Sequence, residues 1–169
     1  MRSLILALAL LAAAPLQAAP PVQPVEHVDL ERYVGRWYEI ARLPMFFQRR
    51  CVADTTAEYT RQTDGSIAVT NRCRSKDGDI DVASGNATVV EGSGNAKLEV
   101  SFVRPFKGDY WIIGLDPDYR WAVVGAPSRK TLWILARSPE LPPADLEQAL
   151  AIARAQGYDL SDLIYTEQH

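Results

Sequence analysis

The sequence of 169 residues predicts an all-β protein in which antiparallel strands form a barrel or a sandwich, followed by one α-helix. Segments in which apolar and polar residues alternate recur at short intervals, and turn-forming residues separate them. Each such strand has one apolar face, and consecutive strands bury these faces most economically by closing on one another. One segment with the apolar spacing of a helix follows the last strand.

Eight segments alternate as strands do, and short turns connect them. Asp64-Gly65, between two of these segments, is a strong signal for a hairpin. The run Asp116-Pro117-Asp118 marks a further turn. The predicted strands are residues 33–42, 55–60, 67–71, 80–90, 97–102, 110–115, 121–125 and 130–137.

The predicted helix begins at Pro142-Pro143, because proline suits the first turn of a helix. Gly157 can cap its end. We expect the helix to pack on the outside of the strands, and residues 158–165 to add a last short strand. The apolar stripe that would face the strands consists of Leu146, Ala149, Leu150 and Ala153.

The N-terminus has the features of a secretory signal peptide. A positive start at Arg2 precedes an apolar run over residues 4–14, which is too short to span a bilayer. We therefore expect a signal peptide at residues 1–18, an extended leader outside the fold at 19–27 and the domain at 28–169. No cysteine follows the cleavage region to accept an N-terminal lipid. The sequence thus predicts a soluble periplasmic or secreted protein that is not lipid-anchored.

Composition argues against several classes of function. The formal net charge is −3, and no basic stripe with interleaved aromatic residues occurs, so we expect no nucleic-acid partner. The two histidines, His27 and His169, lie near the termini, which argues against a histidine-based metal site or catalytic triad. No phosphate-binding glycine loop or nucleophile-elbow motif is present. We expect no cofactor, no metal and no enzymatic activity.

The two cysteines, Cys51 and Cys73, both follow the predicted signal peptide. An exported protein meets oxidising conditions, so we expect them to form a disulfide, with two buried free thiols as the alternative. A tight turn at Asp64-Gly65 would place Cys73 opposite Thr56. The bridge therefore requires residues 46–52 to fold back over the hairpin.

Three motifs in the chain resemble those of the lipocalins, in the form typical of the bacterial and apolipoprotein-D-like branch. The motifs are the run from Gly35-x-Trp37 to Ile40, residues 115–123, and Arg137 after residues 132–135. This resemblance implies an eight-stranded antiparallel up-and-down β-barrel that binds one small hydrophobic ligand. In this branch, the ligand would be a fatty acid or a lysophospholipid. The resemblance also implies that Arg137 lies across Trp37 at the closed end, beside Gly35.

The interior of such a barrel can be assigned from the alternation of each strand. Side chains alternate along a strand, so if Trp37 and Arg137 face inward, Trp133 and Leu135 face inward too. On each of the other strands, we assign to the interior the alternate set of residues that is more apolar. Small residues such as Ala83 would leave room for a ligand, although the same side chains would equally fill an ordinary core. Asn71, if buried, needs a partner that a ligand head group or water could supply. The predicted ligand-binding residues are Ala57, Tyr59, Val69, Asn71, Ala83, Phe102, Trp111, Ile113, Trp133 and Leu135.

The predicted mouth of the barrel is the apolar loop that follows the first strand. Consecutive large apolar residues in an exposed loop are costly unless they cover a cavity or contact an apolar partner. Flanking arginines would suit a carboxylate or phosphate head group, although each could equally be an ordinary solvated side chain. The predicted mouth residues are Arg42, Met45, Phe46, Phe47 and Arg49.

Two other functions remain open at this point. Some proteins with this fold are isomerases, and an inward Cys73 could act as a nucleophile unless the disulfide removes its thiol. The protein could instead act through its surface, as an interaction protein of the envelope stress response. The apolar loop leaves transient membrane contact and a homodimer open as well.

Overall fold

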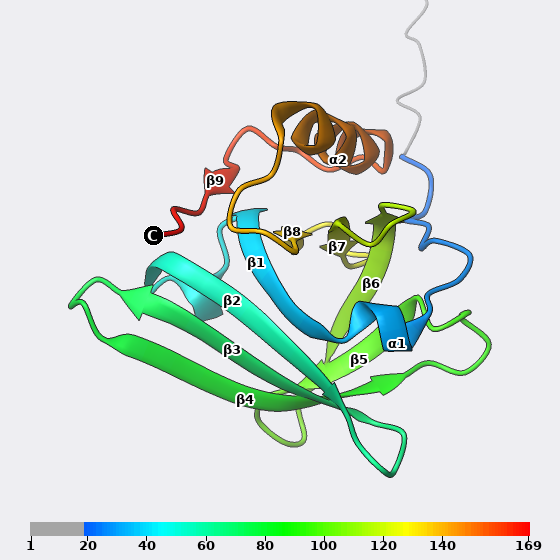
Figure 1. Ribbon diagram of the computed structural model, residues 1–169. Helices are drawn as coiled ribbons and strands as arrows, with labels where there is room; N and C mark the ends of the chain where they lie inside the picture. Colours follow the sequence, from blue (N-terminus) through cyan, green and yellow to red (C-terminus); the bar gives the residue numbers. More distant parts are fainter. Residues whose placement is uncertain (1–18) are drawn as a thin grey trace, which may run out of the picture.

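The computed structural model describes residues 19–169 and consists of one closed β-barrel with a helix outside it (Figure 1). The predicted signal peptide, residues 1–18, lies outside the described residues. Strands β1 to β8 follow one another as antiparallel neighbours, and β1 pairs with both β8 and β2, which closes the sheet. The predicted eight-stranded antiparallel barrel with one external helix is therefore confirmed.

The strands are β1 (Gly35–Arg42), β2 (Cys51–Arg61), β3 (Ile67–Ser75), β4 (Ile80–Val89), β5 (Lys97–Ser101), β6 (Gly108–Leu115), β7 (Trp121–Gly125), β8 (Leu132–Ala136) and β9 (Ile164–Tyr165). The helices are α1 (Leu30–Tyr33), the 3₁₀ helix η1 (Phe46–Gln48) and α2 (Pro143–Ala155). Tyr33 was expected to open the first strand, but it ends α1, whose N-terminus is capped by the Asp29 side chain. No helix among residues 19–169 is long and apolar enough to cross a membrane.

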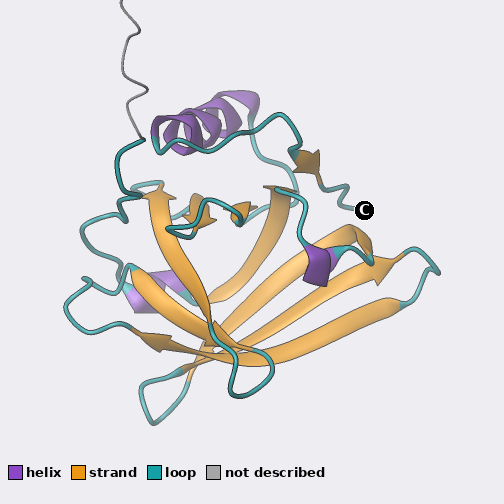
Figure 2. Ribbon diagram, turned by 180° about the vertical axis from the view of Figure 1, so that it is seen from behind, coloured by secondary structure: helices purple, strands orange, loops and turns teal. Residues whose placement is uncertain are grey.

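Helix α2 lies on the outside of the barrel, as both views show (Figures 1 and 2). Its buried face contains Ala149, Leu150 and Ala153, in the predicted stripe, and packs against the outer faces of β6 and β7. Gly114 of β6 leaves the space for this contact, because a Cβ there would lie 3.0 Å from the Ile152 side chain. This packing means that β6 is apolar on both faces.

The segment before α1 is extended, but it belongs to the fold rather than preceding it. Val22 is buried in the core beneath α2, and the Val25 backbone N–H donates to the Ile112 carbonyl at 2.9 Å. Gly94 makes room for this segment, because a Cβ at Gly94 would lie 2.0 Å from the Glu26 carbonyl oxygen. The expectation of a leader outside the fold is wrong, because its apolar residues cover surface that the barrel leaves uncovered.

The predicted disulfide between Cys51 and Cys73 is confirmed, with the two Cα atoms 5.4 Å apart. The route to it differs from the expectation. Residues 46–52 do not fold back over the hairpin, because β2 begins at Cys51 and contains two register shifts before Thr56. These irregularities place Cys51 opposite Ser75, diagonal to Cys73. The bridge thus joins neighbouring strands within the sheet.

Candidate functional site

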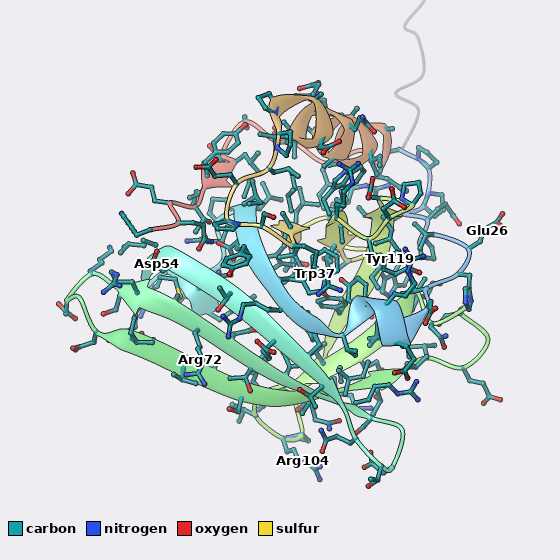
Figure 3. The ribbon with its side chains drawn as sticks, in the orientation of Figure 1. Glu26, Trp37, Asp54, Arg72, Arg104 and Tyr119 are labelled. Atoms are coloured by element: carbon teal, nitrogen blue, oxygen red, sulfur yellow. A yellow bond between two sulfur atoms is a disulfide. The ribbon has the colours of Figure 1, made fainter. Side chains whose placement is uncertain are left out.

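The closed end of the barrel is sealed by Trp37 and Arg137. The Arg137 guanidinium carbon lies 3.9 Å from the centroid of the Trp37 ring, which is a cation–π contact. Arg137 also donates to three backbone carbonyls of α1 and β1, and Trp37 Nε1 donates to the Tyr33 carbonyl at 2.8 Å. Gly35 adopts a φ of +94°, and a Cβ there would lie 3.5 Å from Arg137 Nη1. The predicted contact between Arg137 and Trp37 is thus present. Figure 3 labels Trp37 inside the barrel.

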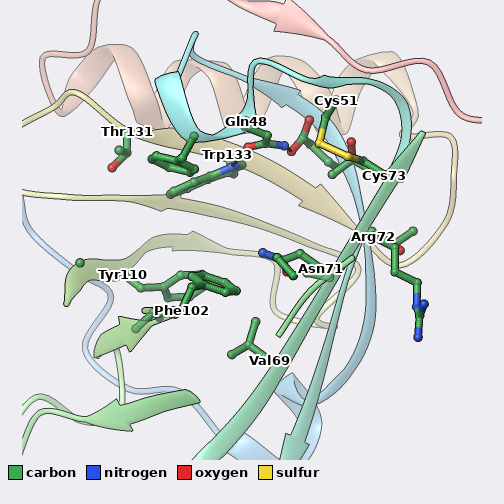
Figure 4. Close-up of a pocket in the computed structure, with 18 of the residues that line it drawn as sticks. Gln48, Cys51, Val69, Asn71, Arg72, Cys73, Phe102, Tyr110, Thr131 and Trp133 are labelled. Carbon is green, nitrogen blue, oxygen red and sulfur yellow. Dashed lines mark hydrogen bonds between the residues drawn. A yellow bond between two sulfur atoms is a disulfide. The ribbon is translucent and has the colours of Figure 1, made fainter. Parts of the chain in front are cut away.

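Above this seal, the barrel contains a cavity of about 600 Å³ (Figure 4). Its volume lies within the range typical of small-molecule sites. Most of its wall consists of apolar and aromatic side chains from the inner faces of the strands. Eight of the ten predicted ligand-binding residues line it, namely Ala57, Tyr59, Val69, Asn71, Ala83, Phe102, Trp133 and Leu135.

The inward positions predicted for Trp111 and Ile113 are wrong. Both side chains belong to the core between α2 and the outer face of β6, and Trp111 also contacts Lys97, whose Nζ lies 4.0 Å from the ring centroid. The inward phase of β6 instead carries Tyr110 and Ile112. Choosing the more apolar phase fails on this strand, because α2 makes its outer face apolar too.

The floor of the cavity carries three tyrosine hydroxyls. The Tyr110 hydroxyl lies 2.8 Å from both the Tyr33 and the Tyr59 hydroxyls, and Tyr59 and Tyr110 line the cavity. Burial raises the pKa of Tyr33 and Tyr110, and it raises the pKa of Tyr59 to about 12. All three hydroxyls are therefore protonated and uncharged at neutral pH. Tyr33 and Tyr110 were not predicted as site residues.

Asn71 is the polar side chain at mid-depth in the cavity wall. It pairs in the sheet with Ala57 on one side and Ala83 on the other, so small side chains flank its carboxamide. Its Oδ1 is buried and has no hydrogen-bond partner within the described protein, and the same holds for Oγ1 of Thr131. Figure 4 shows the Asn71 carboxamide directed toward the cavity. The side-chain nitrogen is the atom seen on the cavity side, so this position offers a ligand a hydrogen-bond donor.

A buried polar network forms the wall near η1. The Glu39 carboxylate accepts hydrogen bonds from Gln48 Nε2 and from Thr166 Oγ1, and it pairs with Arg42 at 3.3 Å. Gln48 in turn accepts from Trp133 Nε1 at 3.1 Å. Burial raises the pKa of Glu39, against the lowering effect of these hydrogen bonds and of Arg42. The network connects β1, η1, β8 and the C-terminal tail. A charged residue in a predicted strand is its only signal in the sequence.

Arg42 is not a mouth residue, and that prediction is wrong. Its side chain is buried, pairs with Glu39 and donates to the carbonyls of Leu43 and Cys51. In a regular strand, residues 39 and 42 would face opposite sides, but β1 has a register shift between Glu39 and Ala41. The shift brings the two charges together inside the wall.

The other predicted mouth residues divide into two groups. Phe47 lines the cavity, with its ring centroid 6.3 Å from that of Trp133. Met45 is buried and does not line the cavity. Phe46 and Arg49 also do not line it; the Arg49 guanidinium carbon lies 4.4 Å from the Phe46 ring centroid.

Charges around the opening do not form the expected cationic rim. Arg50 lines the cavity, but its Nε is paired with Asp81 at 2.9 Å. The Arg72 side chain points away from the cavity on the outer face of β3 (Figures 3 and 4). Three acidic residues, Glu39, Asp81 and Asp109, are also part of the lining. The residues that line the cavity therefore have no excess of positive charge.

Comparisons with known proteins agree with this architecture. A family model described as a lipocalin-like domain matches residues 28–168. Outer membrane lipoprotein Blc of Vibrio cholerae is 39% identical over 149 residues, covering 87% of this chain and 86% of the relative. Temperature-induced lipocalin-1 of Arabidopsis thaliana is 40% identical over 159 residues, covering 85% and 81%. Mouse apolipoprotein D is 34% identical over 158 residues, covering 89% and 81%.

Solved structures share the fold at lower sequence identity. Insecticyanin of the tobacco hornworm Manduca sexta matches with a TM-score of 0.69 at 22% identity, over 90% of this chain and 92% of that one. The cockroach allergen Per a 4 matches with a TM-score of 0.71 at 18% identity, over 90% and 96%. At these identities, the likeness concerns the fold alone.

The comparisons overturn the expectation about localisation. Relatives from Vibrio cholerae, Citrobacter freundii and Escherichia coli K12 are outer membrane lipoproteins. A lipoprotein is lipid-anchored, so the expectation that the protein is not lipid-anchored is wrong. That expectation rested on one missing cysteine near the predicted cleavage region, whereas these relatives resemble the chain over most of its length.

Proposed function

This chain belongs to the lipocalin-like family, and we propose that its barrel binds one acyl-chain ligand, a fatty acid or a lysophospholipid. Members of this family bind small hydrophobic ligands. The observation that carries the proposal is the cavity of about 600 Å³, closed at one end and lined mainly by apolar side chains. Burial of each CH₂ group contributes about 0.8 kcal/mol, so a chain of ~16 carbons can offset the cost of association.

The proposed place of action is the bacterial cell envelope. The outer membrane lipoproteins among the relatives support this assignment, since they resemble the chain over most of its length. Storage or transport of a lipid fits a barrel of this kind better than the isomerase alternative. Cys73 lines the cavity, but its sulfur is bonded to Cys51, which withholds the thiol that such a nucleophile requires.

We further propose that the open end contacts a lipid surface when ligand is exchanged. Phe46 and Phe106 are 77% and 74% exposed, and Val103 is 66% exposed. They lie next in sequence to η1 and β5–β6 residues that line the cavity, such as Phe47 and Phe102. Exposed apolar groups of this size mark interaction sites. Flotation with phospholipid vesicles tests the proposal: Phe46→Ser with Phe106→Ser should reduce co-flotation, and unchanged flotation would refute it.

Ligand binding itself is tested by isothermal titration with fatty acids and lysophospholipids of increasing chain length. We expect one saturable site, with affinity that rises with chain length until the cavity is filled. No saturable binding for any chain between ~12 and ~18 carbons would overturn the proposal. Native mass spectrometry of protein isolated from an envelope fraction would identify a co-purified lipid, and it would also test the homodimer, which stays a prediction.

A further inference from the structure

The charges around the cavity do not favour an anionic ligand. Of the described arginines in its lining, Arg50 is paired with Asp81, and Arg72 points away. A carboxylate at the opening would meet the uncompensated negative charge of Asp109 and the paired carboxylate of Asp81. Deeper in the barrel, it would lose its hydration without meeting a cation, which is costly for an ion.

The polar groups inside the cavity are suited to an uncharged oxygen or amide. The Asn71 carboxamide offers donors and an acceptor without net charge, and its buried Oδ1 has no partner in the described protein. Ala57 and Ala83 flank it, so a ligand group can reach it without displacing a large side chain. A chain passing between the opening and the floor would place a polar group beside this carboxamide.

The tyrosine cluster adds a donor at the floor. Its three hydroxyls carry three protons but form two hydrogen bonds, so one O–H remains undonated whichever way the bonds run. In two of the three arrangements, this O–H belongs to Tyr59 or Tyr110, which face the cavity. An uncharged acceptor on the ligand can use this proton without bringing charge to the floor.

We propose that the cavity selects acyl-chain ligands whose polar group is uncharged, such as alcohols, amides and esters, over the free carboxylate of equal chain length. Asn71 is the residue that binds this uncharged group. The inference rests on the proposed binding of an acyl chain, and it names which chemical class of acyl ligand the site prefers. Figure 4 shows the side-chain nitrogen of Asn71 directed toward the cavity, where it can donate to an uncharged acceptor on the ligand.

Titration with dodecanol, dodecanamide and dodecanoate at pH 8 tests this selectivity in the wild-type protein. We expect dodecanoate to bind about tenfold more weakly than dodecanamide, because its charge would lose hydration there without meeting an unpaired cation. Equal affinity of the acid and the amide would overturn the inference and leave the proposed function standing. If none of the three compounds binds, and their counterparts of up to ~18 carbons do not bind either, the proposed function fails, and this inference fails with it.

Variants of Asn71 test its role. Asn71→Leu should lower the affinity for dodecanamide by about fivefold, which corresponds to the loss of one hydrogen bond. The affinity for dodecanoate should stay nearly unchanged. Asn71→Ala serves as a second variant, in case leucine is not accommodated. We expect it to reduce the ratio of the affinity for dodecanamide to the affinity for dodecanoate in the same way. Thr70→Val is the matched control, because it removes a polar atom from the adjacent position of β3, which is not part of the cavity lining. An equal loss for acid and amide in both Asn71 variants would overturn the assignment of Asn71.

Discussion

Inside the barrel, the closed end and the cavity differ in how completely their polar groups are paired. At the closed end, Trp37 is fully buried, its indole N–H is bonded, and Arg137 both covers the ring and donates to backbone carbonyls. Toward the open end, Asn71 Oδ1 and Thr131 Oγ1 are buried without protein partners. Phe47, which also lines the cavity, is 70% exposed.

This difference indicates where the chain gains stability and where it retains capacity to bind. Large buried side chains with satisfied polar atoms stabilise a fold, whereas unpaired buried atoms and exposed aromatic rings cost free energy unless a ligand or partner contacts them. The disulfide and the Glu39 network lie toward the open end, where hydrophobic packing is reduced by the cavity. These covalent and polar contacts connect the strands and loops of the cavity wall, where hydrophobic packing contributes less.

The largest expected effect is at the closed end. Trp37→Ala should reduce the free energy of unfolding by about 3 to 5 kcal/mol, because it removes a large buried ring. Arg137→Ala should also destabilise the protein, and the double variant should lose less than the sum of the two because the side chains touch. Chemical denaturation of the three variants measures this, and strictly additive losses would contradict an energetic role for the contact.

A charged side chain in the cavity wall should weaken binding strongly, in addition to any loss of stability. Trp133→Glu should weaken acyl-chain binding by about 100-fold, because the chain would have to desolvate a carboxylate. Arg50→Ala should weaken it far less, since Arg50 is already paired with Asp81. Titration with dodecanol compares the two variants. A larger loss in Arg50→Ala would mean that the opening, rather than the wall, determines affinity.

The disulfide should matter less than the tryptophan seal. Its cysteines are 22 residues apart, so replacing Cys51 and Cys73 by alanine should reduce the free energy of unfolding by about 3 kcal/mol. Denaturation of the variant beside the oxidised wild type measures the change. Ligand affinity should fall too, because the bridge fixes β2 and β3 where they line the cavity. Unchanged affinity would show that the open end keeps its shape without it.

The closed end could be predicted because its residues stand in motifs that resemble those of the lipocalins. The resemblance implied that Arg137 lies across Trp37 beside Gly35, and the structure contains that arrangement. The cavity wall was predicted well on strands with one apolar face, as at Val69 and Asn71. Family membership confirms the resemblance drawn from these motifs.

The errors arise where a partner distant in sequence, or a shift of register, decides the direction of a side chain. Trp111 and Ile113 face outward because α2 covers β6. Arg42 is buried because β1 is irregular after Glu39, which brings its guanidinium to the Glu39 carboxylate. Thr166 of the C-terminal tail donates to the same carboxylate. Alternation along a single strand contains no information about either cause. The tyrosine cluster likewise depends on Tyr33 of α1, which the sequence placed in a strand.

The smallest expected effect is the pH dependence that Glu39 confers on stability. Burial raises the pKa of its carboxyl in the folded protein, so the folded state binds this proton more tightly than the unfolded state does. Stability should therefore fall as pH rises from the ordinary carboxyl pKa through the raised one, and stay at the lower level above it. Glu39→Gln should remove this decline, while the loss of the ion pair with Arg42 shifts the whole curve. Denaturation across the acidic pH range compares the shapes of the two curves, because the other carboxylates titrate in both proteins. Parallel curves would mean that Glu39 titrates alike in the folded and unfolded states, and that the wall beside η1 is more hydrated than its burial indicates.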